Sequence, residues 1–286
     1  MAVVLTVVLS ILSHSVTDIK LSSKDEESQR AFSAAEAGIE QVLITGSDAS
    51  GPIGDANFTA SVTGYGSGTK TLVYPSALYA GETATIWFVS HAADGSLTCT
   101  GWPCFKSPNN DSIKVCWGNE GTNANSAVTP ALEISVVYAK NPGNYNQIQI
   151  GRAAYDPYTG RPGGNNFASP VGSGCQIGTT NFAFYKTFQF GGNGADQLSI
   201  PNSSYRFENG LQFIRYRLFY NNVAHLVGID VTGGANTVLP SQGSLITSSG
   251  TAAAGESNRK IEVYQSFGEV PGVFSSTVFS SGGIVK

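Results

Sequence analysis

The first 45 residues of this 286-residue chain contain no proline, and their only glycine is Gly38. Residues 1–12 form an apolar run, and a charged stretch from Asp18 to Arg30 joins it to a second segment in which apolar residues recur. Because nothing here forces a break, the sequence predicts one continuous helix. At 1.5 Å per residue it would be about 68 Å long, several times the length of an ordinary globular helix. Such a rod needs a membrane or copies of itself to bury its apolar surface.

The apolar half of this helix, residues 1–19, would span about 28 Å, close to the thickness of a hydrocarbon core. It is a poor permanent anchor, because an aspartate as deep as Asp18 costs on the order of 3 kcal/mol on insertion. We therefore expect a segment that first lies in a membrane and later moves into a protein-lined core. A cleavable secretory signal is the alternative, but the basic n-region is absent, and Ser13-His-Ser15 is a weak cleavage site.

A block within the second half of this helix carries a family resemblance. The segment Ser28-Gln-Arg-Ala-Phe-Ser-Ala-Ala-Glu-Ala-Gly-Ile-Glu40 follows an apolar helix and resembles the N-terminal region of type IV pilin-like proteins, in particular the branch with an A-F-x-A-A-E-A-G-I-E signature. The resemblance is specific over residues 1–44, and the closing stretch 259–274 is also similar to chains of this branch. Leu5 stands where major pilins carry a glutamate, as in minor pilins. The chain begins at the apolar residues, which fits a mature form starting at Met1.

The resemblance implies a series of processing and assembly steps for the chain. A prepilin peptidase removes a leader, the mature chain is methylated, and its helix waits in the inner membrane as a single pass. The pilus assembly machinery then extracts it into an extracellular filament, a helical homopolymer of identical subunits. The expected core of that filament is built by Met1, Val4, Leu5, Val8, Leu9, Ile11, Leu12, His14 and Asp18. His14 and Asp18 are four positions apart and share a face, either as a polar contact inside the core or as an interfacial pair near headgroups.

The amphipathic half of the helix, residues 28–44, has apolar residues at spacings of three and four. This stripe is expected to dock the helix onto the chain's own head domain. Its members are Phe32, Ala35, Ile39, Val42 and Leu43.

Gly46 and Pro52 mark the end of the helix and of a first domain, residues 1–46. Residues 47–286 consist of short β-branched and aromatic runs separated by Gly, Asn, Ser and Pro, which predicts a large, mostly antiparallel, β-rich globular head of one domain or two closely joined lobes. The expected fold class is therefore α+β. Asn221-Asn222, between two candidate strands, predicts a tight hairpin turn.

The four cysteines lie in the head, and their spacing lacks the CxxC pairs of zinc sites. An even count in an exported domain indicates disulfides. Three pairings are formally open, and we favour Cys99 with Cys104 and Cys116 with Cys175. Pairing of Cys99 with Cys116 across a hairpin is the main alternative.

Composition and motifs argue against several function classes. Charged residues are 13% of the chain and the net charge is −4, so no broad nucleic-acid-binding surface is evident. No catalytic motif is recognisable, and we expect no enzymatic activity, cofactor or metal. Residues 156–164 carry a single carboxylate, which is too few for a calcium site, and they are expected to form a turn.

Three hypotheses follow from these observations. The first is a structural filament subunit with a role in adhesion, motility or another surface interaction. The second is a minor or tip pilin, or a pseudopilin, with an adhesive head. The third is a membrane-tethered glycan-binding or hydrolytic domain, for which Trp87, Trp102 and Trp117 would be the candidate platform.

Overall fold

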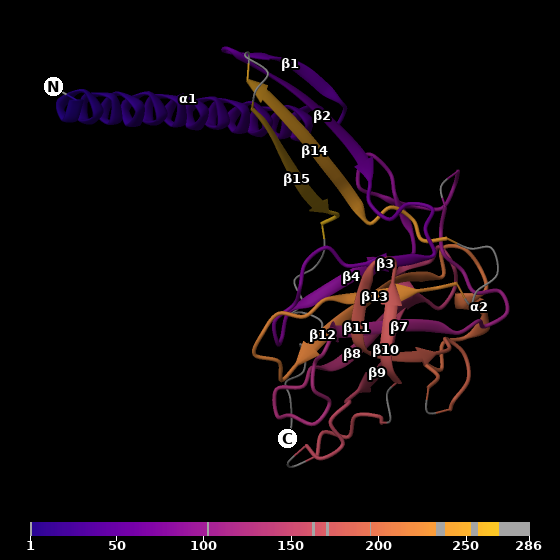
Figure 1. Cartoon of the computed structure of the whole chain (residues 1–286). Helices are drawn as coiled ribbons and strands as arrows, with labels where there is room; N and C mark the ends of the chain where they lie inside the picture. Colours follow the sequence, from indigo (N-terminus) through magenta and orange to yellow (C-terminus); the bar gives the residue numbers. More distant parts are fainter. Residues whose placement is uncertain are drawn as a thin grey trace, which may run out of the picture. The chain divides into compact units, whose positions relative to one another are not determined.

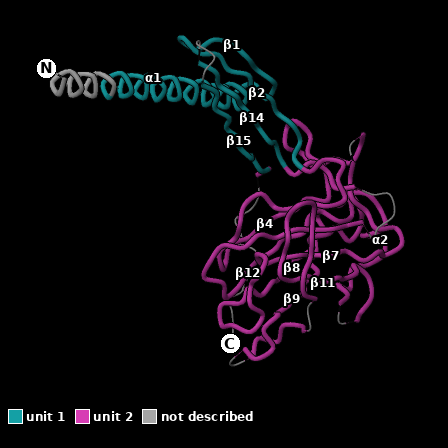
Figure 2. Tube along the Cα trace, in the orientation of Figure 1, with its two compact units in different colours: residues 1–65, 243–266 teal, residues 66–242, 267–286 magenta. Residues whose placement is uncertain are grey.

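The chain forms two compact units, coloured separately in Figure 2. One comprises residues 1–65 and 243–266, and the other comprises residues 66–242 and 267–286. The computed structural model describes residues 2–101, 103–161, 164–169, 172–194, 196–232, 238–252 and 257–268, with side chains described from residue 14 onward.

The first unit combines the N-terminal helix with one antiparallel sheet of strand order β1-β2-β14-β15 (Figure 1). The chain leaves this sheet after β2 and returns to it about 180 residues later with β14, which pairs with β2 along its length. The elements are α1 (Ala2–Thr45), β1 (Ala49–Ile53), β2 (Ala56–Gly64), β14 (Gly243–Ala252) and β15 (Asn258–Ser266).

The helix ends in a left-handed cap. Gly46 has a φ of +67°, a conformation that glycine adopts without steric cost, and its N–H donates to the Val42 carbonyl at 2.8 Å. Two residues later the Asp48 carboxylate accepts from the Val62 N–H at 2.8 Å. These bonds turn the chain directly from the helix into the sheet.

The second unit contains two larger antiparallel sheets and a short two-stranded ribbon. The five-stranded sheet has the order β10-β11-β7-β13-β3, with β3 (Thr71–Val73), β7 (Ile113–Asn119), β10 (Gly172–Ile177), β11 (Thr180–Phe188) and β13 (Val227–Asp230). The four-stranded sheet has the order β4-β12-β8-β9, with β4 (Thr83–Trp87), β8 (Ala131–Ala139), β9 (Ile148–Tyr155) and β12 (Leu211–Phe219). The remaining elements are β5 (Ser90–His91), β6 (Leu97–Thr98), η1 (Tyr145–Gln147) and α2 (Asn202–Tyr205).

Aromatic rings join the two large sheets into one core. Phe88, which follows β4, and Phe188, which ends β11, both pack edge-on against Phe190, with ring centroids 6.1 and 6.0 Å away. Phe105 and Tyr205 complete the cluster on either side. Because each such ring buries on the order of 150–250 Å², this cluster is a main source of the unit's apolar burial.

The expected α+β class is wrong. In the described part of the chain, α1 is the only helix of seven or more residues, and the body that follows it is strand-rich and antiparallel. Beyond Gly46 the runs of β-branched and aromatic residues are too short to carry a helical period, so no second helical layer forms. A long N-terminal helix followed by a β head is consistent with the structure.

The tight hairpin expected at Asn221 is also wrong. β12 pairs with β4 and β8, whereas the next strand, β13, pairs with β3 and β7 in the other sheet. The chain therefore crosses between sheets here. Buried Asn221 holds the crossover, since its side-chain amide donates to the carbonyls of Leu78 at 3.0 Å and Val223 at 2.9 Å.

Candidate functional site on the N-terminal helix

The C-terminal part of α1 packs against its own sheet, mainly against β14 and β2 (Figure 1). The buried face of the helix is rich in small side chains, and only two large aliphatic residues take part. Its buried residues are Ala31, Ala34, Ala35, Gly38, Ile39 and Val42. Ile39 and Val42 form one apolar cluster with Ala60 of β2 and Ile246 of β14.

Two glycines bring the helix unusually close to the sheet. A Cβ placed on Gly38 would lie only 2.8 Å from Cδ2 of Phe58, a separation that real Cβ atoms essentially never show. A Cβ placed on Gly250 of β14 would collide with the helix backbone at Ala31 and Ala35. The junction between helix and sheet therefore depends on the absence of side chains at both positions.

The sequence-predicted docking stripe divides between two environments. Ala35, Ile39 and Val42 are buried against the sheet, whereas Phe32 and Leu43 are each 46% exposed. On a helical wheel, Phe32 and Leu43 lie at the edge of the buried face and not at its centre.

Sequence reasoning missed Ala31, Ala34 and Gly38, because it looked for large apolar residues. With Ala35 these three occupy positions i, i+3, i+4 and i+7 from Ala31, a helical stripe of small residues that is visible in the sequence.

The part of α1 that precedes the sheet has no covering within the described chain. All residues from 14 to 26 are exposed, and the apolar side chains of Val16, Ile19 and Leu21 are each more than half exposed. His14 and Asp18 of the expected filament core lie in this exposed stretch. The other expected core residues lie outside the residues whose side chains are described, namely Met1, Val4, Leu5, Val8, Leu9, Ile11 and Leu12.

Over the part of α1 with described side chains, and in the other described helices, no segment has the length and apolarity needed to cross a membrane.

Some charges on the helix are neutralised within the first unit. Arg30 pairs with Glu26 one turn earlier at 2.6 Å and with Asp55 at 3.4 Å. Arg259 of β15 donates to the Ser28 hydroxyl at 2.8 Å. These exposed contacts fasten the helix at the point where it reaches the sheet, although each is worth at most about 1 kcal/mol.

Both disulfides follow the pairing favoured from the sequence. Cys99 is joined to Cys104, and Cys116 of β7 is joined to Cys175 of β10. The alternative pair of Cys99 with Cys116 is not formed, because all four cysteines are already in these two bonds.

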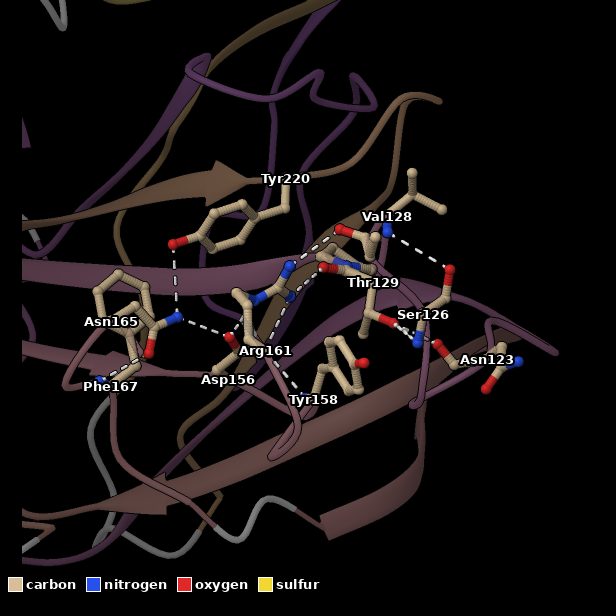
Figure 3. Close-up of polar contacts among 12 residues, drawn as sticks. Asn123, Ser126, Val128, Thr129, Asp156, Tyr158, Arg161, Asn165, Phe167 and Tyr220 are labelled. Atoms are coloured by element: carbon tan, nitrogen blue, oxygen red, sulfur yellow. Dashed lines mark hydrogen bonds and ion pairs between the residues drawn. The ribbon is translucent and has the colours of Figure 1, made fainter. Parts of the chain in front are cut away.

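The segment from residue 156 to 161, within the stretch expected to form a turn, is organised by an arginine (Figure 3). The Arg161 guanidinium makes two hydrogen bonds to the Asp156 carboxylate, at 2.5 and 3.0 Å, and donates to the carbonyls of Ala127 and Thr129 at 2.9 and 3.0 Å. The guanidinium also lies over the ring of Tyr220, with its Cζ atom 3.7 Å from the ring centroid. The buried Arg161–Asp156 pair therefore holds together three segments, namely its own, the one with Ala127 and Thr129, and the one with Tyr220.

The Asp156 carboxylate is fully engaged in these contacts. Burial by itself would raise its pKa, but hydrogen bonds from Arg161, the Tyr158 N–H and the Asn165 amide outweigh burial and lower the pKa. The carboxylate is thus occupied as a structural anchor. No group of three or more His, Cys, Asp or Glu side chains in the described residues could hold a metal ion.

The structure describes two of the three tryptophans of the candidate binding platform. Trp87 and Trp117 are buried, and the Trp117 indole donates to the Pro130 carbonyl at 2.9 Å, which identifies both as core residues. Trp102 lies outside the described residues.

Comparison of the chain with models of protein families, with curated proteins and with solved structures gives no match in any of the three.

Proposed function

We propose that this protein is a structural subunit of an extracellular type IV pilus-like filament, which polymerises by packing its N-terminal helices in a filament core. The observation that supports this most is the division of α1. Among the α1 residues whose side chains are described, those that bury against the chain's own sheet lie between Ala31 and Val42, and the stretch from residue 14 to 26 is exposed.

Exposure of the apolar side chains in this stretch of helix to water is energetically unfavourable. Burying an aliphatic side chain such as Val16, Ile19 or Leu21 is worth about 1.5–3 kcal/mol. Isolated helices shorter than about 12–15 residues, roughly the length of this stretch, are marginal in water even in good helix formers. Packing several parallel copies of α1 side by side would supply the missing burial without any change in the head.

The pilin-like signature has a structural role that fits this proposal. Ala34, Ala35, Gly38 and Ile39 of the signature lie in the junction between helix and sheet. A close junction fixes the sheet of the first unit against its helix, so every copy would present the same exposed helix surface, which a regular polymer requires. The two disulfides fit a domain that works outside the cell, in an oxidising environment.

The remaining parts of the proposal come from the resemblance alone. Before assembly the helix would be held in the inner membrane, and a prepilin peptidase and the pilus assembly machinery would process and extract it. Adhesion, motility or another surface interaction would then be the role of the finished filament.

A pair of matched substitutions in the full chain tests the proposal. Val16 on the helix and Val223 in the second unit are 52% and 53% exposed, so Val16→Asp and Val223→Asp make the same chemical change at equal exposure. We expect wild type and Val223→Asp to yield filaments by electron microscopy and Val16→Asp to yield few or none. The proposal fails if wild type never polymerises, or if Val16→Asp polymerises as wild type does.

The abundance of this chain in purified filaments separates the two pilin hypotheses. A major subunit would account for most of the filament protein, whereas a minor or tip subunit would be present in few copies.

A further inference from the structure

The exposed surface of α1 carries two like-charged pairs. Lys20 and Lys24 are four residues apart, as are Glu36 and Glu40, so the members of each pair share a helix face. All four side chains are exposed. Unlike Arg30, none of the four forms an ion pair or side-chain hydrogen bond within the described part of the chain.

This arrangement does not stabilise a lone helix. Like charges at i and i+4 repel each other and destabilise a helix. The charges on this surface are therefore better satisfied by a partner than by the chain itself.

The spacing of the two pairs fits a partner with the same helix. Lys20 precedes Glu36 by sixteen positions, and Lys24 precedes Glu40 by sixteen positions. Sixteen residues of α-helix correspond to about 24 Å of axial rise and to a net rotation of about 160°. Residues sixteen apart thus point in nearly opposite directions. If one parallel copy is displaced along the axis by this distance, its lysine pair faces the glutamate pair of the first.

We propose that a second copy of this chain docks on the exposed face of α1 in this register, with its Lys20 and Lys24 against Glu36 and Glu40. The inference rests on the proposed filament and specifies how adjacent helices are staggered within it. The opposite charges at both positions give the register its specificity, because a displacement by one turn leaves one pair unmatched.

An apolar contact follows the same register. Val16 precedes Phe32 by the same sixteen positions, and their side chains are 52% and 46% exposed. Phe32, Glu36 and Glu40 are all exposed, whereas their neighbours Ala35 and Ile39 are buried against the sheet. The proposed partner therefore lies on the side of α1 that its own sheet leaves open.

A charge exchange in the full chain tests the register. K20E/K24E and E36K/E40K should each reduce the yield of filaments sheared from producing cells by about tenfold or more, and the loss should be sensitive to ionic strength. The quadruple variant, which restores opposite charges with their signs exchanged, should recover most of the yield. K140E/R206E is the matched control, since it makes the same charge change at exposed cations of the second unit and should polymerise as wild type does.

Disulfide trapping gives a readout that does not depend on yield. All four native cysteines are already paired, so new cysteines are selective. Oxidised filaments of V16C/F32C should run as a ladder of covalent multimers in denaturing electrophoresis. L21C/F32C should not, because Leu21 points away from Val16 on the helix.

The outcomes separate this inference from the proposed function. Absence of filaments from wild type overturns both. Normal filaments from K20E/K24E, failure of the quadruple variant to recover, or equal cross-linking of the two cysteine variants would overturn the register and leave the filament proposal standing. If only K20E/K24E were defective and E36K/E40K were normal, the lysines would serve an anionic membrane surface instead, and the register would again be wrong.

Discussion

Substitution of Gly250 by alanine tests the junction between α1 and the sheet of the first unit. A Cβ at this position would lie 2.5 Å from the Ala35 nitrogen, whereas ordinary contacts begin near 3.4 Å. The Ala31 carbonyl oxygen lies closer still. Both obstacles are backbone, which cannot rotate away, so β14 and α1 must separate by more than about 1 Å. Gly250 has no positive φ, so the effect reports the loss of space and not strain in the backbone of the strand.

The size of the effect follows from what the junction buries. Ile39 and Val42 are nearly fully buried, and together they contribute about 3–6 kcal/mol relative to exposure. A gap of about 1 Å forfeits about half of the contact energy. Gly250→Ala should therefore destabilise the helix–sheet contact by about 1–3 kcal/mol, in the usual range for overpacking.

Amide hydrogen exchange of the full chain measures this locally. A loss of 2 kcal/mol should speed exchange in residues 31–42 by about thirtyfold. Gly51→Ala in β1 is the control, because its Cβ would be in ordinary contact at 3.7 Å from Phe58, and we expect a change within about 0.5 kcal/mol. If the amides of residues 31–42 were equally protected in Gly250→Ala and Gly51→Ala, the claim that α1 and β14 approach too closely for a side chain at residue 250 would be refuted.

Three further outcomes are expected from the second unit. Arg161→Ala should lower the free energy of unfolding by about 3–5 kcal/mol in a denaturant titration, because it leaves the buried carboxylate of Asp156 unpaired, and unchanged stability would contradict this role. Because the pKa of Asp156 is lowered on folding, its contribution is complete above its ordinary value of 3.8 and is lost as the pH falls through the folded pKa. Stability should therefore drop below about pH 4, and Asp156→Asn should flatten that dependence. Replacing Cys116 and Cys175 by serine opens a 59-residue span and should cost about 4 kcal/mol, against about 2 kcal/mol for the five-residue span of the other disulfide. If the denaturation midpoint fell further on loss of the five-residue disulfide than on loss of the 59-residue one, the loop-entropy estimate would be contradicted.

Local sequence patterns predicted the elements better than their partners. The absence of proline and the single glycine before Gly46 were enough to predict the long helix, and the short β-branched and aromatic runs were enough to predict strands. The pairing of β14 with β2 could not be predicted, because such runs do not say which distant strand lies alongside. The same limit explains the error at Asn221, where a turn-forming residue joins strands of different sheets.

The docking face of the helix shows a second limit. Hydrophobicity favoured Phe32 and Leu43, whereas the geometry buries Ala31, Ala34 and Gly38. Close helix–sheet packing selects small residues, and a search for large apolar side chains is blind to them. The disulfide pairing favoured from the sequence is the one that the structure contains.

Electron cryomicroscopy of filaments sheared from producing cells tests the central claim most directly. The account predicts a core of parallel α1 helices, adjacent copies staggered by about 24 Å, with the β units outside. A filament that lacks this chain, or in which residues 1–30 have been removed or lie outside the core, would contradict it.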